Sequence, residues 1–145
     1  MKVMRVLLII VAIASVGLSV FAQPDVSKDK VIAYYFHGTF RCYSCRFIEK
    51  NTELAIKKYF DDALKSGQLV FKAVNVEKKE NQHFVNDYQL YTKSVVLSLV
   101  RDGKEMKFKN LEKVWQLLRN KDKFYKYIKE ETQGFLDELS EDDKT

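Results

Sequence analysis

The chain has 145 residues, of which 46% are hydrophobic and 31% are charged, and its formal net charge is +5. Removal of Lys2 and Arg5 with an N-terminal leader takes this charge from +5 to +3, and lysines interleave with glutamates in the segments 78–80 and 121–131, as on solvated helix faces. No basic cluster alternates with stacking aromatic residues, so we do not expect nucleic acid as a partner.

The N-terminal leader has the pattern of a secretory signal peptide. Lys2 and Arg5 precede an apolar run from Val6 to Phe21, and small residues stand three and one positions before a cleavage site after Ala22. An uncleaved membrane anchor is the alternative, although this run is shorter than the ~20 residues of a spanning helix. We therefore expect residues 1–22 to be removed and residues 23–145 to form one exported domain, in the periplasm or cell envelope.

The first predicted elements are a strand and a long helix. Lys30–Phe36 is β-branched and aromatic without clean alternation, as in a strand buried on both faces. Apolar residues then recur at helical intervals from Arg46 to Leu64, and Ser66-Gly67 supplies a stop. We expect one helix here, with a bend near Asn51-Thr52.

The next elements complete a sheet. A second strand, Gln68–Val76, implies a right-handed β-α-β crossover and a parallel pair. Glu77–Tyr88 predicts a shorter helix, Ser94–Val100 a third strand, and Asp102-Gly103 a hairpin turn. Glu105–Lys109 should pair back as an antiparallel edge, protected by its lysines.

The last part of the chain is predicted to be helical. Asn110 can cap a helix with Leu111, Val114 and Trp115 on its inner face. The helical pattern resumes after Asn120 and runs to a polar end that should fray from Ser140.

Cys42 and Cys45, the only cysteines in the chain, form a C-x-x-C motif between the first strand and the first helix. Unsatisfied N–H groups and the helix dipole favour a thiolate at a helix N-terminus. We therefore predict that Cys42 is the attacking sulfur and Cys45 the resolving one. Arg41 and Arg46 flank the pair and add positive charge, and no acidic residue lies between positions 37 and 48.

Other roles for the cysteine pair stay open. It could be a permanent disulfide, although a loop this short removes little chain entropy, or it could bind arsenic(III) or another soft ion. A closed zinc site needs about four ligands, and His37 and His83 are far apart in sequence, so we expect neither a resident metal nor a cofactor. His37 could instead assist proton transfer at Cys42 or simply bond the backbone.

The element order β-α-β-α-β-β-α, with C-x-x-C at the first strand-to-helix turn, resembles the thioredoxin fold over nearly all of residues 23–145. This resemblance implies an α/β fold with a mixed central sheet and helices on both faces. More narrowly, the chain is similar to the exported thioredoxin-like family called nitrophenyl compound nitroreductase subunit ArsF. The similar segments are 35–42, 75–77, 87–94 and 110–115. That name implies arsenical or nitroaromatic reduction beside membrane electron-transfer proteins.

Three features depart from the thioredoxins. Thioredoxins place a cis-proline before the third strand, where its backbone pairs with a bound peptide, but Lys93–Val96 has no proline. They also bury an acidic proton acceptor on the first strand, and the matching position here is about Phe36. Tyr43 and Ser44, between the cysteines, match neither the Gly-Pro of well-known reductants nor the Pro-His of oxidants, so the redox direction stays open.

We expect a redox partner protein, because the sequence shows no source of electrons for the cysteine pair. The chain has no second cysteine pair and no recognisable nucleotide or flavin motif. We expect a monomer that meets a redox partner, such as a membrane thiol transporter, on a face with Phe40, Tyr43 and Tyr91–Ser94, and that touches the membrane only through it. If the protein is an oxidant, the same face would meet an oxidase instead. Alternatively, Phe40, Tyr43 and Tyr91 could line a pocket for an aromatic substrate.

Overall fold

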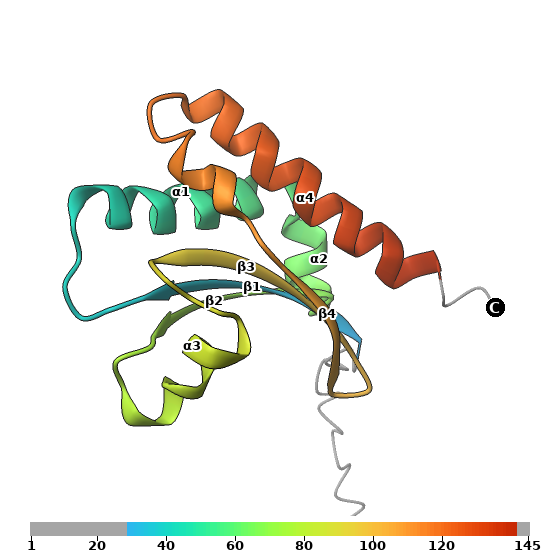
Figure 1. Cartoon of the computed structure of the whole chain (residues 1–145). Helices are drawn as coiled ribbons and strands as arrows, with labels where there is room; N and C mark the ends of the chain where they lie inside the picture. Colours follow the sequence, from blue (N-terminus) through green and yellow to red (C-terminus); the bar gives the residue numbers. More distant parts are fainter. Residues whose placement is uncertain (1–28, 142–145) are drawn as a thin grey trace, which may run out of the picture.

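The computed structural model describes residues 29–141, which build a four-stranded mixed sheet between helices (Figure 1). The sheet order is β2-β1-β3-β4, with β1 parallel to β2 and β3 antiparallel to both β1 and β4. The strands are β1 (Lys30–His37), β2 (Leu69–Asn75), β3 (Ser94–Arg101) and β4 (Lys104–Asn110). This topology confirms the predicted α/β thioredoxin-like fold. The predicted signal peptide, residues 1–22, lies outside the described residues.

Helices cover both faces of this sheet. They are α1 (Tyr43–Tyr59), α2 (Asp61–Ser66), α3 (His83–Asp87) and α4 (Lys121–Glu141), with short 3-10 turns at Lys79–Asn81 and Glu112–Trp115. Figure 1 shows α1 and α4 on one face and α3 on the other. The loop from β1 into α1 therefore emerges at one end of the sheet, and it leads directly to the cysteines.

The central strand β1 separates two apolar clusters. Val31, Ala33 and Tyr35 pack with α1 and α4, whereas the alternate residues Tyr34 and Phe36 pack with α3. Successive side chains of a strand point to opposite faces, so a strand with helices on both sides must be apolar at every position. The continuous apolar run predicted this burial correctly.

The first helical region differs from the prediction at its start and its bend. α1 begins at Tyr43 rather than near Arg46, and the chain breaks at Phe60 rather than near Asn51-Thr52. The Asn51 side chain stays within the helix, where its amide donates to the Phe47 carbonyl at 2.9 Å. Gly67, at φ 78°, ends α2 in the left-handed conformation, as the predicted stop required.

The later helices are shorter or begin later than predicted. Asn110 does not cap a helix, because it remains in β4 opposite Val96. The cap is Asn120, whose Oδ1 accepts the Lys123 backbone N–H at 3.0 Å at the start of α4. Similarly, the helix predicted over 77–88 is only a 3-10 turn followed by α3. α4 continues through Ser140 to Glu141, so the predicted fraying does not begin at Ser140.

The β3–β4 hairpin forms as predicted. Asp102 and Gly103 both have positive φ, 47° and 77°, which is the conformation of a tight hairpin turn between twisted strands. The lysines of β4 are exposed, and two of them also tie this edge to α4. Lys107 pairs with Glu138, and Lys109 pairs with Glu131 at 2.6 Å.

Candidate active site

The two cysteines form a disulfide at the N-terminus of α1. Cys42 is the N-cap residue of α1, and its Sγ accepts the Cys45 backbone N–H at 3.2 Å. Cys45 is only 1% exposed, whereas Cys42 is partly exposed. A partner sulfur can therefore approach Cys42 but not Cys45, and the first-turn N–H groups lie where a Cys42 thiolate would form.

Tyr35 lies beneath the first turn of α1. Its hydroxyl donates to the Cys45 carbonyl at 2.7 Å, and its side chain is fully buried. Burial raises the pKa of Tyr35 to about 12, against a smaller lowering by Arg41, so the hydroxyl stays a neutral donor. Phe36, expected to match the buried acid of thioredoxins, faces α3 instead. The residue of β1 that reaches the cysteine turn is therefore Tyr35.

Arg41 lies in a cluster that the local sequence did not predict. Its guanidinium pairs with Glu49, lies 3.2 Å from both ring nitrogens of His37 and stands 5.9 Å from the centre of the Tyr35 ring. Glu49 directly follows the segment 37–48, which has no acidic residue. It lies in the second turn of α1, from which its side chain reaches back to Arg41. The charge of Arg41 is therefore shared with a carboxylate, which weakens its expected help to a Cys42 thiolate.

The other auxiliary candidates are placed differently. His37 donates from Nδ1 to the Gly38 carbonyl at 2.8 Å. This is the backbone bond expected as the alternative to a role in proton transfer. Ser44 is partly buried in the first turn of α1. Tyr43 and Arg46 are exposed on the outer side of this helix.

The loop before Cys42 is tied to the end of β2. The Thr39 backbone N–H donates to Glu77 Oε2 at 2.9 Å, and the Asn75 amide donates to Thr39 Oγ1 at 3.1 Å. A Cβ at Gly38 would meet the Glu77 carboxylate, so a larger residue there would push this flexible side chain aside and disturb its bond to Thr39. Hydrogen bonds from Thr39 hold the pKa of Glu77 below its usual value. The tether explains the polar Asn75 at the end of β2.

The segment before β3 lacks the cis peptide bond that the resemblance to thioredoxins would imply there. No cis peptide bond occurs in residues 29–141, so the Lys93–Ser94 bond is trans. The Lys93 carbonyl already accepts the Trp115 indole N–H at 3.0 Å, and the Ser94 hydroxyl donates to the Thr92 carbonyl at 2.9 Å. This loop is therefore held by bonds within the chain.

The predicted aromatic pocket does not form as one cavity. Phe40, Tyr43 and Tyr91 are 78%, 85% and 95% exposed. Tyr91 lines a small hollow of about 160 Å³ beside the β1–α1 loop, whereas Tyr43 lines a separate groove of about 380 Å³ on α1. The aromatic residues thus offer exposed surface around the disulfide rather than an enclosed substrate site.

Residues 29–141 bring together no metal-binding cluster and include no membrane-spanning helix. Within this range no three His, Cys, Asp or Glu side chains cluster as a metal site would require. His83 belongs to α3, where its Nδ1 lies 2.7 Å from the Asp87 carboxylate. None of the described helices has the length and apolar character needed to span a membrane.

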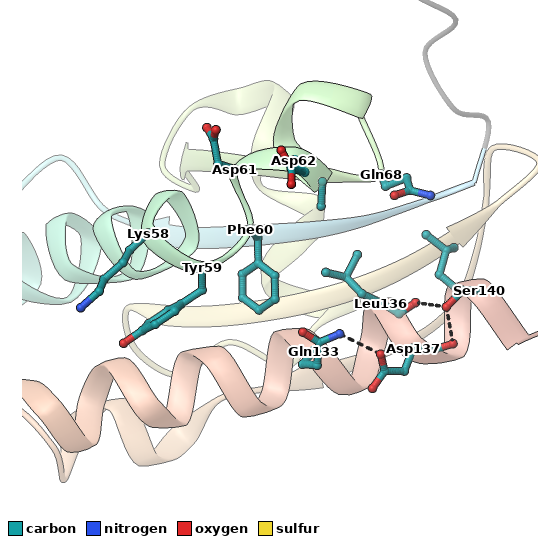
Figure 2. Close-up of a pocket in the computed structure, with 12 residues that line it drawn as sticks. Lys58, Tyr59, Phe60, Asp61, Asp62, Gln68, Gln133, Leu136, Asp137 and Ser140 are labelled. Atoms are coloured by element: carbon teal, nitrogen blue, oxygen red, sulfur yellow. Dashed lines mark hydrogen bonds between the residues drawn. The ribbon is translucent and has the colours of Figure 1, made fainter.

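A hollow of about 550 Å³ lies between the α1–α2 break and α4, at the end of α1 away from the disulfide (Figure 2). Its polar side chains do not converge. Gln133 donates to Asp137 at 2.7 Å within α4, and Asp61 pairs with Lys65 within α2. Figure 2 shows Asp61 pointing away from α4. We therefore assign no chemistry to this hollow.

The sequence matches no protein-family model and no curated protein. Among solved structures, it is similar to a malarial protein at 16% identity, over 56% of this chain and 80% of the other, with a TM-score of 0.37. It is also similar to Fasciola hepatica thioredoxin at 18% identity, over 68% of this chain and 81% of the other, with a TM-score of 0.37. These scores add no argument by themselves. The sheet order and the helix-capping disulfide show that the chain has a thioredoxin-like fold with a C-x-x-C pair suited to thiol–disulfide chemistry.

Proposed function

We propose that the protein is a thiol:disulfide oxidoreductase in which Cys42 exchanges with a partner and Cys45 resolves the mixed disulfide. The observation that supports it best is the difference in exposure between the two sulfurs at the N-terminus of α1. A structural disulfide needs no such difference. Exchange needs one sulfur that a partner can reach and one that is shielded until the mixed disulfide forms.

In the reducing direction, the Cys42 thiolate attacks one sulfur of a partner disulfide, and the other partner sulfur leaves as a thiolate. The Cys45 thiolate then attacks Cys42 Sγ, and the second partner sulfur leaves. Two electrons have passed to the partner, and the Cys42–Cys45 disulfide of the structure remains. The oxidising direction runs through the same mixed disulfide in reverse.

The mixed disulfide provides the test of this assignment. With Cys45→Ser, trapping in cell extracts should accumulate partners joined through Cys42, because nothing resolves the intermediate. Cys42→Ser should trap little, since Cys45 is buried. Trapping by Cys42→Ser alone would contradict the assigned roles. A reduction potential below about −300 mV, with both sulfurs inert to exchange, would instead identify a structural disulfide.

The cellular setting is a further part of this proposal. Export rests on the N-terminal pattern, and arsenicals or nitroaromatics as final substrates rest on the sequence resemblance alone. As a monomeric reductant, the protein would receive electrons from a membrane thiol transporter. Thiol alkylation in cells tests the direction: a pair that is reduced in wild-type cells and oxidised without the transporter supports a reductant, whereas a pair oxidised in both strains contradicts it.

A further inference from the structure

A shallow groove runs along the outer side of α1, starting beside the cysteines. Its walls are Tyr43, Phe47 and Leu54 on α1, together with Lys121 at the start of α4. The Phe47 ring packs edge-on against Phe124 of α4, with ring centres 5.7 Å apart, which fixes the floor of the groove. Tyr43 and Leu54 remain exposed, so apolar surface stands open to solvent along this face.

The charged residues that line this groove are all positive. Arg46, Lys50 and Lys121 line it, and no carboxylate does. Arg46 and Lys50 are four residues apart on one helix, where like charges repel and cost some stability. The neighbouring acids of α1 do not relieve them, because Glu49 pairs with Arg41 and Glu53 pairs with Lys57. Asp122, in the first turn of α4, is not part of the lining.

We propose that this groove docks an acidic segment of the redox partner protein, adjacent to the partner's reacting cysteine. Apolar side chains of the segment pack along the row formed by Tyr43, Phe47 and Leu54, and its carboxylates face the three cations. From Tyr43 to Leu54 the helix rises ~16 Å, which matches about five residues of extended chain. A segment of this length reaches from the groove to Cys42, since Tyr43 follows that cysteine directly.

The loop before β3 favours this location. Thioredoxins pair that loop with a bound peptide, but here the Lys93 carbonyl accepts the Trp115 indole N–H and the Lys93–Ser94 bond is trans. Recognition must then come mainly from side chains. The groove on α1 supplies apolar contact together with long-range attraction for an acidic partner. This inference rests on the proposed function, because the docked segment delivers a sulfur to Cys42.

Two peptide disulfides test the docking. Both carry one cysteine and one leucine, flanked by glutamates in one peptide and by lysines in the other, and each cysteine is joined to a neutral thiopyridyl group. When the Cys42 thiolate attacks the peptide sulfur, thiopyridone leaves and is measured by absorbance. Cys45 then releases the peptide thiol. At low salt the reduced protein should react about tenfold faster with the acidic peptide, and salt should remove the difference.

Matched variants show whether the peptide preference comes from the cations of the groove or from the net charge of the protein. Arg46→Glu with Lys50→Glu should abolish or invert the preference, whereas Lys72→Glu with Lys104→Glu, an equal charge change on exposed strand residues, should keep it. Circular dichroism confirms that each variant is folded. Equal rates for the two peptides, or equal loss in both double variants, would overturn the docking. If the wild type reacts no faster than Cys42→Ser with either peptide, the proposed function itself fails.

Discussion

At the scale of single residues, Tyr35 is the β1 side chain that reaches the cysteine turn, where an acidic proton acceptor was expected by resemblance. A carboxylate there could accept a proton, whereas the Tyr35 hydroxyl is a neutral donor that reaches the Cys45 carbonyl rather than a sulfur. Its raised pKa of about 12 keeps it protonated at any physiological pH. Tyr35 therefore positions the first turn of α1 and does not exchange protons with the cysteines.

We expect Tyr35→Phe to lower the free energy of unfolding by about 0.5–1.5 kcal/mol, because one buried hydrogen bond is lost while the ring volume is kept. Tyr43→Phe is the matched control, since its ring is 85% exposed, and it should leave stability unchanged. Denaturant unfolding at neutral pH measures both. Equal stability of Tyr35→Phe and the wild type would show that the hydroxyl contributes nothing.

The same variant also tests how the stability of the protein changes at high pH. A folded-state pKa of about 12 against an ordinary value of 10.0 means that folding favours the protonated Tyr35. Its contribution is complete below pH 10.0 and is lost as the pH rises towards about 12. The difference in stability between the wild type and Tyr35→Phe should therefore narrow over this range. A constant difference would contradict the raised pKa.

At the scale of elements, the tether between the β1–α1 loop and the end of β2 holds the cysteine turn in place. Glu77 is the charged member of the tether, and its lowered pKa means that folding favours the ionised carboxylate. This stabilisation is present above the ordinary value of 4.5 and is lost as the pH falls through the lower folded-state pKa.

We therefore expect Glu77→Gln to melt at a lower temperature than the wild type at neutral pH, and the two to converge in acid. Amide exchange at Thr39 should be faster in the variant, since its N–H loses a charged acceptor. Glu80→Gln, a nearby exposed change in the 3-10 turn, is the control and should alter neither measurement. A Glu77→Gln variant with unchanged Thr39 exchange would show that the tether does not hold the loop.

The elements also show how far the sequence alone could predict this protein. All four strands, the hairpin turn and the cysteines at a helix start followed from local patterns, because apolar runs, Asp102-Gly103 and a C-x-x-C spacing act over a few residues. The break at Phe60 was not predicted, since no glycine or proline marks it; the residue at the break is buried in the core. Tertiary packing decides such a boundary.

The site was predicted only in part for the same reason. The pair Cys42 and Cys45 is local, but the contacts that surround it join distant residues. Thr39 meets Glu77 across a separation of 38, and Tyr35 reaches Cys45 because strand alternation turns it towards α1. The pairing of Arg41 with Glu49 was not predicted, because Arg41 lies in the loop before the helix that carries Glu49.

At the scale of the whole molecule, most of the contacts that hold the fold lie away from the disulfide. Apolar clusters fill both faces of the sheet, and each strand pairs with its neighbour along its length, with one irregularity between Leu99 and Val100 of β3. The cysteines are separated by only 3 positions, so their bond closes a very short loop. Closing such a short loop removes little entropy from the unfolded chain, so the bond stabilises the folded state by about 2 kcal/mol at most.

Reduction should therefore leave the protein folded, with the free energy of unfolding lowered by no more than about 2 kcal/mol and the melting temperature by no more than about 10 °C. Thermal unfolding with and without a non-thiol reductant measures this change. The double variant Cys42→Ala/Cys45→Ala should melt near the reduced wild type and should not respond to the reductant. A loss above about 4 kcal/mol, or unfolding of the reduced protein at room temperature, would mean that the bond supports the fold. A dithiol that cycles must be folded in both states, so a small loss is the result that thiol exchange requires.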